Sequence, residues 1–166
     1  MITNLETPCF LLDESELARS INGFDSALEE FFNRHIIGYS VKTNSLPYAI
    51  AYAKKYGCYA EVVSYDELGL AVECGYELNR IIYNGPMKSR DSFIRAITGG
   101  AVVNIDTQRD VEWLKDLPND KVYNIGIRLS VNISQVSPKD TDGDDDFSRF
   151  GFSDETDEFA KAIETI

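Results

Sequence analysis

The 166-residue sequence has almost no histidine, and this absence removes several kinds of enzyme site. His35 is the only histidine, and it stands at the predicted start of a strand, whereas sites in parallel α/β proteins lie at the carboxyl ends of strands. A Ser/His/Asp or Cys/His mechanism and a multi-histidine zinc site are therefore not expected within this chain. We interpret His35 as a residue at the edge of a strand.

Paired cysteines, a leader segment and long apolar runs are also missing. Cys9, Cys58 and Cys74 stand far apart, without a CxxC spacing, and their odd number leaves at least one unpaired. The first residues show neither a basic region nor an apolar core of a signal peptide, and no stretch approaches the roughly 20 apolar residues of a membrane span. These absences predict free thiols and a cytoplasmic location.

Basic side chains are scarce relative to acidic ones. With 16 Lys and Arg against 28 Asp and Glu, the formal net charge is -12, which repels phosphate backbones and anionic membrane surfaces. We therefore expect neither nucleic acid nor a membrane as a partner. Hydrophobic residues make up 43% of the chain, enough for a folded domain with a sizeable core.

Short apolar segments alternate regularly with segments of helical period, which indicates repeated βα units. Six strands are predicted, at residues 9–12, 35–41, 59–63, 80–83, 101–105 and 122–129. Six helices are predicted between and after them, from Asp13 to about residue 33 and at residues 47–56, 66–74, 89–98, 108–117 and 154–166. The strands are almost continuously apolar, as in parallel sheets covered by helices.

The pattern of elements leaves two α/β architectures open, a doubly wound sheet and a barrel. The GxGxxG signature is absent, and polar residues gather at the predicted carboxyl ends of the strands, as they do in barrels. A complete (β/α)8 barrel of the TIM type needs eight units, so we expect an incomplete barrel of about six βα units. The last predicted helix runs to residue 166 without a cap or tail, so we expect a fragment.

Residues 134–148 (SQVSPKDTDGDDDFS) depart from the alternating pattern. This segment is acidic and contains Pro and Gly, which predicts an exposed, mobile loop. Its aspartates invite a calcium interpretation, but their spacing does not match an EF-hand loop and no Glu closes it. We expect no metal site.

Lys42 is the candidate for catalysis, because it ends the apolar segment 35–41. A lysine there would have its stem packed in a low dielectric, which favours the neutral amine that forms a Schiff base with an aldehyde. Taken alone, these features still favour the simpler interpretation that Lys42 leaves a strand for solvent.

Seven short strings strengthen the case for Lys42, because they share their order and spacing with one protein family. They are residues 7–13 (TPCFLLD), 39–44 (YSVKTN), 61–68 (EVVSYDEL), 84–88 (NGPMK), 103–107 (VNIDT), 127–129 (IRL) and 148–152 (SRFGF). This series resembles the pyridoxal 5'-phosphate (PLP) dependent decarboxylases of diaminopimelate, ornithine and arginine. The family has the alanine-racemase-like barrel, also called fold type III. The match is best to diaminopimelate decarboxylases.

The resemblance implies roles for particular residues. Lys42 would hold PLP through its amine, and Glu61, Ser64 and Arg128 would lie near the cofactor. Glu61 stands where the family often has Asp, and Arg128 would steady the cofactor or a neighbouring carboxylate. Glu67 could instead be a structural residue at a helix N-terminus. Weaker candidates are Asn84, Asp106 and Asn132.

The resemblance also implies an activity and a place in a larger protein. The expected reaction is decarboxylation of a diamino acid substrate, with meso-diaminopimelate to lysine as the first choice and ornithine, arginine or carboxynorspermidine as alternatives. Residues 1–166 would form only the N-terminal part of the PLP-binding barrel domain, without the later histidine, phosphate loop and β domain. We therefore expect the isolated chain to be inactive. We also expect a homodimer or other self-association, because an incomplete barrel leaves strand edges unpaired. A racemase, a non-catalytic PLP-binding protein and a regulator of a full-length enzyme are the other interpretations.

Overall fold

The computed structural model describes residues 6–131, 150–153 and 156–166. Asn132 and the predicted loop 134–148 lie outside the described residues, and so does the start of the SRFGF string. The chain divides into two units, Met1–Ile37 and Gly38–Ile166, which we describe separately. No helix in the described part of the chain has both the length and the apolar character needed to cross a membrane.

The first unit contains one helix, α1 (Glu14–Glu29), which begins where the sequence predicts. Asp13 caps it by accepting hydrogen bonds from the backbone N–H groups of Ser15 at 2.9 Å and Glu16 at 3.2 Å. The predicted strand at residues 9–12 is wrong. These residues pair with none of the described strands, and Phe10 is fully exposed. His35 lies outside any strand, with its Nε2 2.7 Å from Oδ1 of Asp25 in α1.

The second unit is built on five parallel strands that follow one another in chain order. They are β1 (Gly38–Ser40), β2 (Tyr59–Ser64), β3 (Ile81–Met87), β4 (Val102–Ile105) and β5 (Asn124–Ile127). A separate parallel pair joins β6 (Leu129–Ser130) to β7 (Phe152–Ser153). The predicted strand 35–41 is thus shorter than expected, the strand 122–129 is interrupted at Arg128, and β7 was not predicted.

Helices connect the strands in the βα alternation that the sequence indicates. They are α2 (Pro47–Lys55), α3 (Tyr65–Glu73), the short 3-10 helix η1 (Leu78–Arg80), α4 (Arg90–Thr98), α5 (Gln108–Leu114) and α7 (Asp157–Thr165). Hydroxyl side chains cap the N-termini of four of these helices. Each hydroxyl accepts a hydrogen bond from the first turn of the helix that follows, and the four residues are Ser64, Ser89, Thr107 and Thr156.

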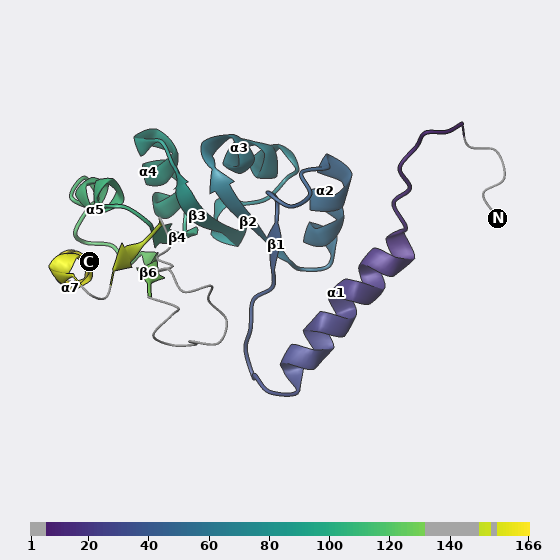
Figure 1. The fold of residues 1–166 in the computed structure, drawn as a ribbon, viewed down its shortest axis with the longest axis horizontal. Coiled ribbons are helices and arrows are strands. Elements are labelled where there is room, and N and C mark those ends of the chain that lie inside the picture. The colour runs from purple at the N-terminus through teal and green to yellow at the C-terminus, as the bar shows by residue number, and fades with distance from the viewer. Residues whose placement is uncertain (1–5, 132–149, 154–155) are drawn as a thin grey trace, which may run out of the picture. The chain divides into compact units, whose positions relative to one another are not determined.

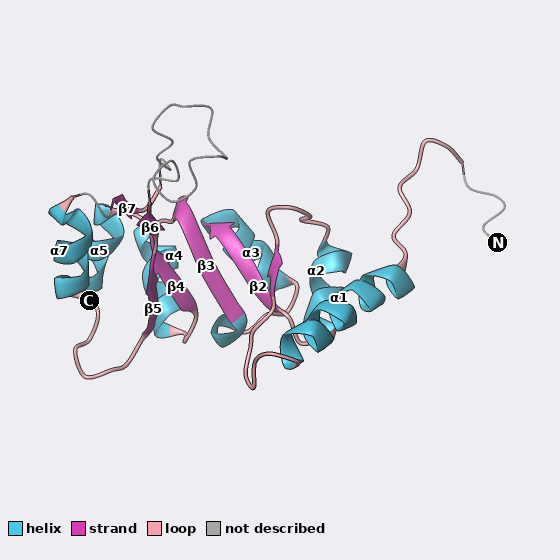
Figure 2. Cartoon of the chain, turned by 60° about the horizontal axis from the view of Figure 1, so that its bottom comes forward, coloured by secondary structure: helices cyan, strands magenta, loops and turns pink. Residues whose placement is uncertain are grey.

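The arrangement of strands and helices distinguishes the two architectures that the sequence left open. The described sheet runs β1-β2-β3-β4-β5 with no reversal of order, whereas a doubly wound sheet reverses. Helices α2, α3 and α4 lie along the same face of this sheet (Figures 1 and 2). Sequential parallel strands with helices on one face form a segment of a (β/α)8 barrel, in which five rather than six strands belong to the sheet.

The hydrophobic core lies between the sheet and its helices. Every second strand residue points into it, so Ala60 and Val62 of β2 are buried, as are Val103 and Ile105 of β4. The helices contribute fully buried partners that include Ile50, Leu68, Phe93 and Ile97. The remaining strand residues face the opposite side of the sheet, which would be the interior of a complete barrel.

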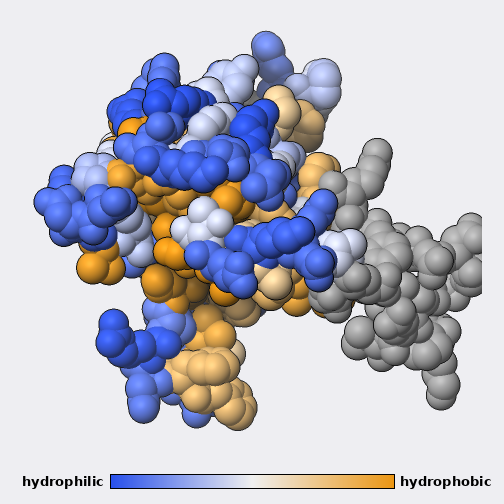
Figure 3. Space-filling model, turned by 90° about the vertical axis from the view of Figure 1, so that its left-hand side faces the viewer, coloured by the Kyte–Doolittle hydropathy of each residue, from blue (hydrophilic) through white to orange (hydrophobic). Residues whose placement is uncertain are grey.

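Hydrophobic side chains also reach the surface of the second unit. Val122 is 99% exposed, and Ile163 and Ile166 of the C-terminal segment are half exposed. On the side of the molecule that carries α5 and α7, Figure 3 shows hydrophobic side chains between charged ones. In the described five-stranded sheet, β5 pairs with β4 only.

Candidate active site

Strand alternation places three polar side chains on the face of the sheet away from the helices. Glu61 in β2, Asn84 in β3 and Asn104 in β4 each alternate with buried apolar neighbours. Their side chains join across the strands. Asn84 Nδ2 donates to Glu61 Oε1 at 2.7 Å, and Asn104 Nδ2 donates to Asn84 Oδ1. A polar row therefore crosses the middle of three neighbouring strands.

This row borders a cavity of about 300 Å³. Three of the four predicted cofactor residues, Lys42, Glu61 and Arg128, line it together. The complete lining is Lys42, Glu61, Val63, Asn84, Gly85, Asn104, Asp106 and Arg128. The weaker candidates Asn84 and Asp106 are thus at the cavity as well.

Lys42 follows β1 and lines the cavity in a turn. The hydroxyl of Thr43 donates to the carbonyl of Ser40 at 2.8 Å, and Tyr39 donates to the carbonyl of Asn44 at 3.0 Å, so both flanks of the turn are held. The expectation that the stem of Lys42 is packed in low dielectric is wrong for this structure. Val41 takes the buried position, and Lys42 is exposed, because β1 ends at Ser40 and the chain then turns.

A bulge in β3 shapes the centre of the cavity. Val62 of β2 pairs with Tyr83, but Ser64 pairs with Met87, so β3 contains two more residues than β2 over this stretch. Gly85 within the bulge has φ +76°, and a Cβ there would lie 2.8 Å from the carbonyl oxygen of Val63. Only glycine allows β3 to pass this close to β2 with that conformation.

Arg128 stands in the break between β5 and β6, and its backbone is held from both sides. Its N–H donates to the carbonyl of Ile105 at 2.9 Å, and its carbonyl accepts from Phe152 at 2.9 Å. Its guanidinium lies 3.5 Å from Asp106 Oδ1 and 5.3 Å from the centre of the Phe150 ring. The side chain remains 43% exposed, so a cation faces the cavity.

Ser64, the fourth predicted cofactor residue, has a structural contact and does not line the cavity. Its hydroxyl accepts from the backbone N–H of Glu67 at 3.2 Å, and the carboxylate of Glu67 accepts from the N–H of Val63 at 2.9 Å. The two residues thus cap α3 reciprocally, much as in a capping box. A contact of Ser64 with a cofactor stays a prediction.

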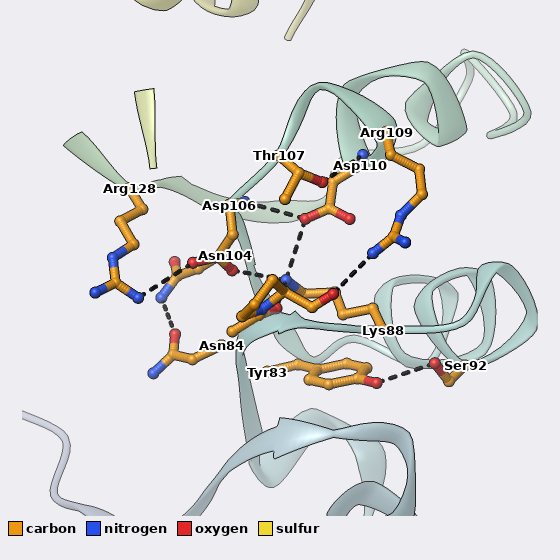
Figure 4. A network of polar contacts seen from close by, with 12 residues as sticks. Tyr83, Asn84, Lys88, Ser92, Asn104, Asp106, Thr107, Arg109, Asp110 and Arg128 are labelled. Atoms are coloured by element: carbon orange, nitrogen blue, oxygen red, sulfur yellow. Dashed lines mark hydrogen bonds and ion pairs between the residues drawn. The ribbon is translucent and has the colours of Figure 1, made fainter. Parts of the chain in front are cut away.

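Sequence reasoning missed a buried charged cluster directly beside the cavity. The side chain of Lys88 is fully buried, and its Nζ contacts Asp106 Oδ2 at 2.7 Å, Asp110 Oδ2 at 3.2 Å and the carbonyl of Gly85 (Figure 4). Asp110 also accepts from the backbone N–H of Asp106 at 3.0 Å. The signal was present, since Lys88 closes the NGPMK string and Asp106 and Asp110 are four residues apart, but neither feature indicates burial.

Comparison of the structure with solved structures identifies the class of protein. Diaminopimelate decarboxylase from M. jannaschii, in complex with L-lysine, superposes with a TM-score of 0.70 at 25% identity, over 95% of this chain and 38% of that one. The arginine decarboxylase of Paramecium bursaria Chlorella virus has the same fold, with a TM-score of 0.61 at 19% identity, over 87% of this chain and 37% of that one. The five-stranded sheet is therefore part of a decarboxylase barrel.

Sequence comparison assigns the family. Residues 15–165 match the pyridoxal-binding domain of the pyridoxal-dependent decarboxylases, and the chain belongs to this family. A probable chloroplastic diaminopimelate decarboxylase of rice (Oryza sativa subsp. japonica) is 31% identical over 90% of this chain and 30% of its own length. The diaminopimelate decarboxylase of Bacillus subtilis is 27% identical over 96% of this chain and 37% of its own length. The chain thus spans only about a third of these relatives.

Proposed function

We propose that residues 1–166 form the N-terminal part of the PLP-binding barrel of an enzyme that decarboxylates a diamino acid, with meso-diaminopimelate as the substrate and lysine as the product. One observation carries the proposal. Lys42 after β1, Glu61 within β2 and Arg128 after β5 line a single cavity. An aldehyde cofactor with anionic groups requires a site in which an amine, a carboxylate and a guanidinium lie close together.

The lining of the cavity fits PLP. Its volume of about 300 Å³ is at the lower end of the range for small-molecule sites, which suits a cofactor with a single ring. Lys42 is exposed in the lining, so its amine is available to bind the aldehyde covalently. When bound, PLP supplies an electron sink that stabilises negative charge left on the α-carbon after loss of CO2.

The chain's own residues would orient the cofactor and the substrate. Arg128 presents a guanidinium to the cavity and would neutralise an anionic oxygen there. Glu61, whose Oε1 accepts from Asn84, would receive a hydrogen bond or a positive charge through its other oxygen. The Asn84–Asn104 link holds Glu61 in place across the sheet.

Relatives support the choice of substrate. The rice and Bacillus subtilis relatives are named as diaminopimelate decarboxylases. Ornithine, arginine and carboxynorspermidine are the alternatives, because decarboxylases of ornithine and arginine have the same fold. We also propose a homodimer or other self-association, which the unpaired outer edges of β1 and β5 in the described sheet support. Cys9, Cys58 and Cys74 form no disulfide in the described part of the chain, which supports a cytoplasmic location.

Covalent labelling tests the assignment of Lys42. The purified chain is incubated with PLP and treated with borohydride, which reduces the bond between the aldehyde and an amine to a stable one, and the labelled lysines are mapped by mass spectrometry. We expect labelling of Lys42 to be at least tenfold faster than that of the exposed Lys115. Equal labelling of both lysines would contradict the proposed cofactor site.

A Lys42→Arg variant is the matched control, since it keeps the charge and removes the primary amine. It should lose the fast labelling and leave labelling of Lys115 unchanged. Substrate identity is tested on the product of the complete reading frame that contains these 166 codons, by measuring CO2 release from meso-diaminopimelate, ornithine and arginine. Release from ornithine or arginine alone would replace the proposed substrate.

A further inference from the structure

The cluster of Lys88, Asp106 and Asp110 is the most deeply buried group of charges in the described part of the second unit. All three side chains are at most 1% exposed. Lys88 leaves the end of β3, Asp106 follows β4, and Asp110 lies in the first turn of α5. The cluster therefore joins two strand ends and one helix at a single point (Figure 4), and its Asp106 also lines the cavity.

Stability alone does not explain this cluster. Removing charges from water is costly, and apolar residues of similar volume often replace buried ion pairs without loss of stability. In addition, Oδ1 of Asp110 is buried and has no hydrogen-bond partner, which costs about 1–3 kcal/mol. A buried cluster with an unsatisfied oxygen points to a function in arranging neighbouring groups.

Asp106 connects the buried cluster to the cavity. Its Oδ2 accepts from Lys88 at 2.7 Å, and its Oδ1 faces the Arg128 guanidinium at 3.5 Å. Asp110 restrains both Lys88 and the backbone of Asp106. Arg128 itself is 43% exposed, and a free arginine side chain has about 2 kcal/mol of rotamer entropy that opposes a single orientation. A carboxylate held rigidly on its other side reduces that freedom.

The charges also balance. Lys88 and Arg128 contribute two positive charges, and Asp106 and Asp110 contribute two negative charges, so the four groups are formally neutral. Arg128 is the member with the greatest exposure, and of the four only Arg128 and Asp106 line the cavity. The three buried side chains thus restrain the exposed Arg128.

We propose that Lys88 is a positioning residue for the candidate active site: by fixing the carboxylate of Asp106, it holds the guanidinium of Arg128 in one orientation at the cavity. Its relevance to cofactor binding rests on the proposed function, but the restraint on Arg128 is a property of this chain alone. A purely structural role would be to satisfy the Gly85 carbonyl and close the bulge in β3.

Side-chain NMR of the full chain, without cofactor, separates the two roles. The order parameter of the Arg128 Nε–Hε bond is measured in the wild type and in Lys88→Gln, with Arg128→Gln used to assign the resonance. We expect a value above about 0.6 in the wild type and below it in Lys88→Gln, since about 0.6 divides ordered from flexible bonds. An unchanged value in folded Lys88→Gln would overturn the proposal.

A second variant covers the possibility that Lys88→Gln fails to fold. Lys88→Met combined with Asp110→Asn removes one positive and one negative charge, so Asp106 and Arg128 remain a balanced pair. The order parameter should fall in this variant too. Lys115→Gln is the matched control, because Lys115 pairs with Glu112 on the surface at 2.6 Å, and it should leave Arg128 unchanged.

The link can also be tested in the opposite direction, by changing Arg128 and observing Lys88, which leaves the buried side chains unaltered. If Asp106 links the two cations, Arg128→Gln must shift the Nζ resonance of Lys88, and an unshifted resonance would overturn the link. Failure of the proposed function has a different signature. In that case the Lys42 labelling is not selective, whatever the order parameter of Arg128.

Discussion

Two lysines follow strands of the same sheet, yet their surroundings differ completely. Lys42 follows β1, a strand of three residues that pairs only with β2, and it is exposed. Lys88 follows β3, a strand of seven residues between β2 and β4, and its side chain is buried against three oxygen acceptors. The difference teaches that one sheet can provide a free amine at its edge and a fixed cation at its centre.

The largest expected effect is the difference in the free energy of unfolding between variants of Lys88 and of Lys42. Lys88→Met removes the buried cation that contacts both Asp106 and Asp110, so it should lower the free energy of unfolding by about 3–5 kcal/mol. Lys42→Met changes an exposed side chain and should stay within about 0.5 kcal/mol of the wild type. Urea unfolding followed by circular dichroism measures both. Equal losses of unfolding free energy in the two variants would contradict the distinction between a lysine at the edge of the sheet and a lysine at its centre.

A smaller effect on stability is expected at the bulge in β3, which precedes Lys88 and places it beside the cavity. Gly85→Ala places a Cβ 2.8 Å from the Val63 carbonyl oxygen at a positive φ, so we expect a loss of about 1–3 kcal/mol and a disturbed cavity. Gly69→Ala is the matched control. It lies within α3 with no atom within 4 Å of the new Cβ, and it should stabilise the chain by up to about 1 kcal/mol. A neutral Gly85→Ala would show that the bulge is not required.

The smallest expected effect is a change in the pH dependence of stability. Burial, with a contribution from Asp110, raises the pKa of Tyr83 to about 12, against the lowering effect of its hydrogen bond with Ser92. Between about pH 10 and pH 12 the unfolded chain loses this proton and the folded chain keeps it, so stability falls as pH rises through this window.

Tyr83→Phe should therefore flatten the alkaline loss of stability, at a cost of about 1 kcal/mol near neutral pH for the lost hydrogen bond. Tyr39 in β1 is the counterpart, because burial also raises its pKa, but it is only partly buried. Tyr39→Phe should flatten the loss less. Urea midpoints from pH 9 to pH 12 measure the three slopes, and identical slopes for wild type and Tyr83→Phe would contradict the burial argument.

Most of the fold of the second unit was predictable because its signals are local. Pro47 at a helix start and the hydroxyl caps Ser89 and Thr107 mark helices at the positions that the structure confirms. The predicted strand at residues 9–12 failed for a non-local reason. A short apolar segment becomes a strand only if another strand accepts its backbone hydrogen bonds, and none of the described strands does so.

The candidate site was predictable only in part. The polar residues at strand ends indicated Lys42 and Arg128, because the carboxyl ends of parallel strands meet at one edge, and the family resemblance added Glu61; all three line the cavity. The capping role of Ser64 was not foreseen, and the exposure of Lys42 agrees with the simpler interpretation that it leaves a strand for solvent; both depend on where a strand ends by one or two residues.

The sequence by itself determined the alternation of strands and helices and the family, and it indicated Lys42 as the candidate lysine, because each of these depends on local periodicity or on short strings of residues. Only the tertiary structure decided that Lys88, Asp106 and Asp110 share one buried site beside Arg128. Burial and ion pairing depend on the register between β3 and β4 and on the packing of α5. Distances between residues far apart in the chain are a property of that packing, and no local pattern records them.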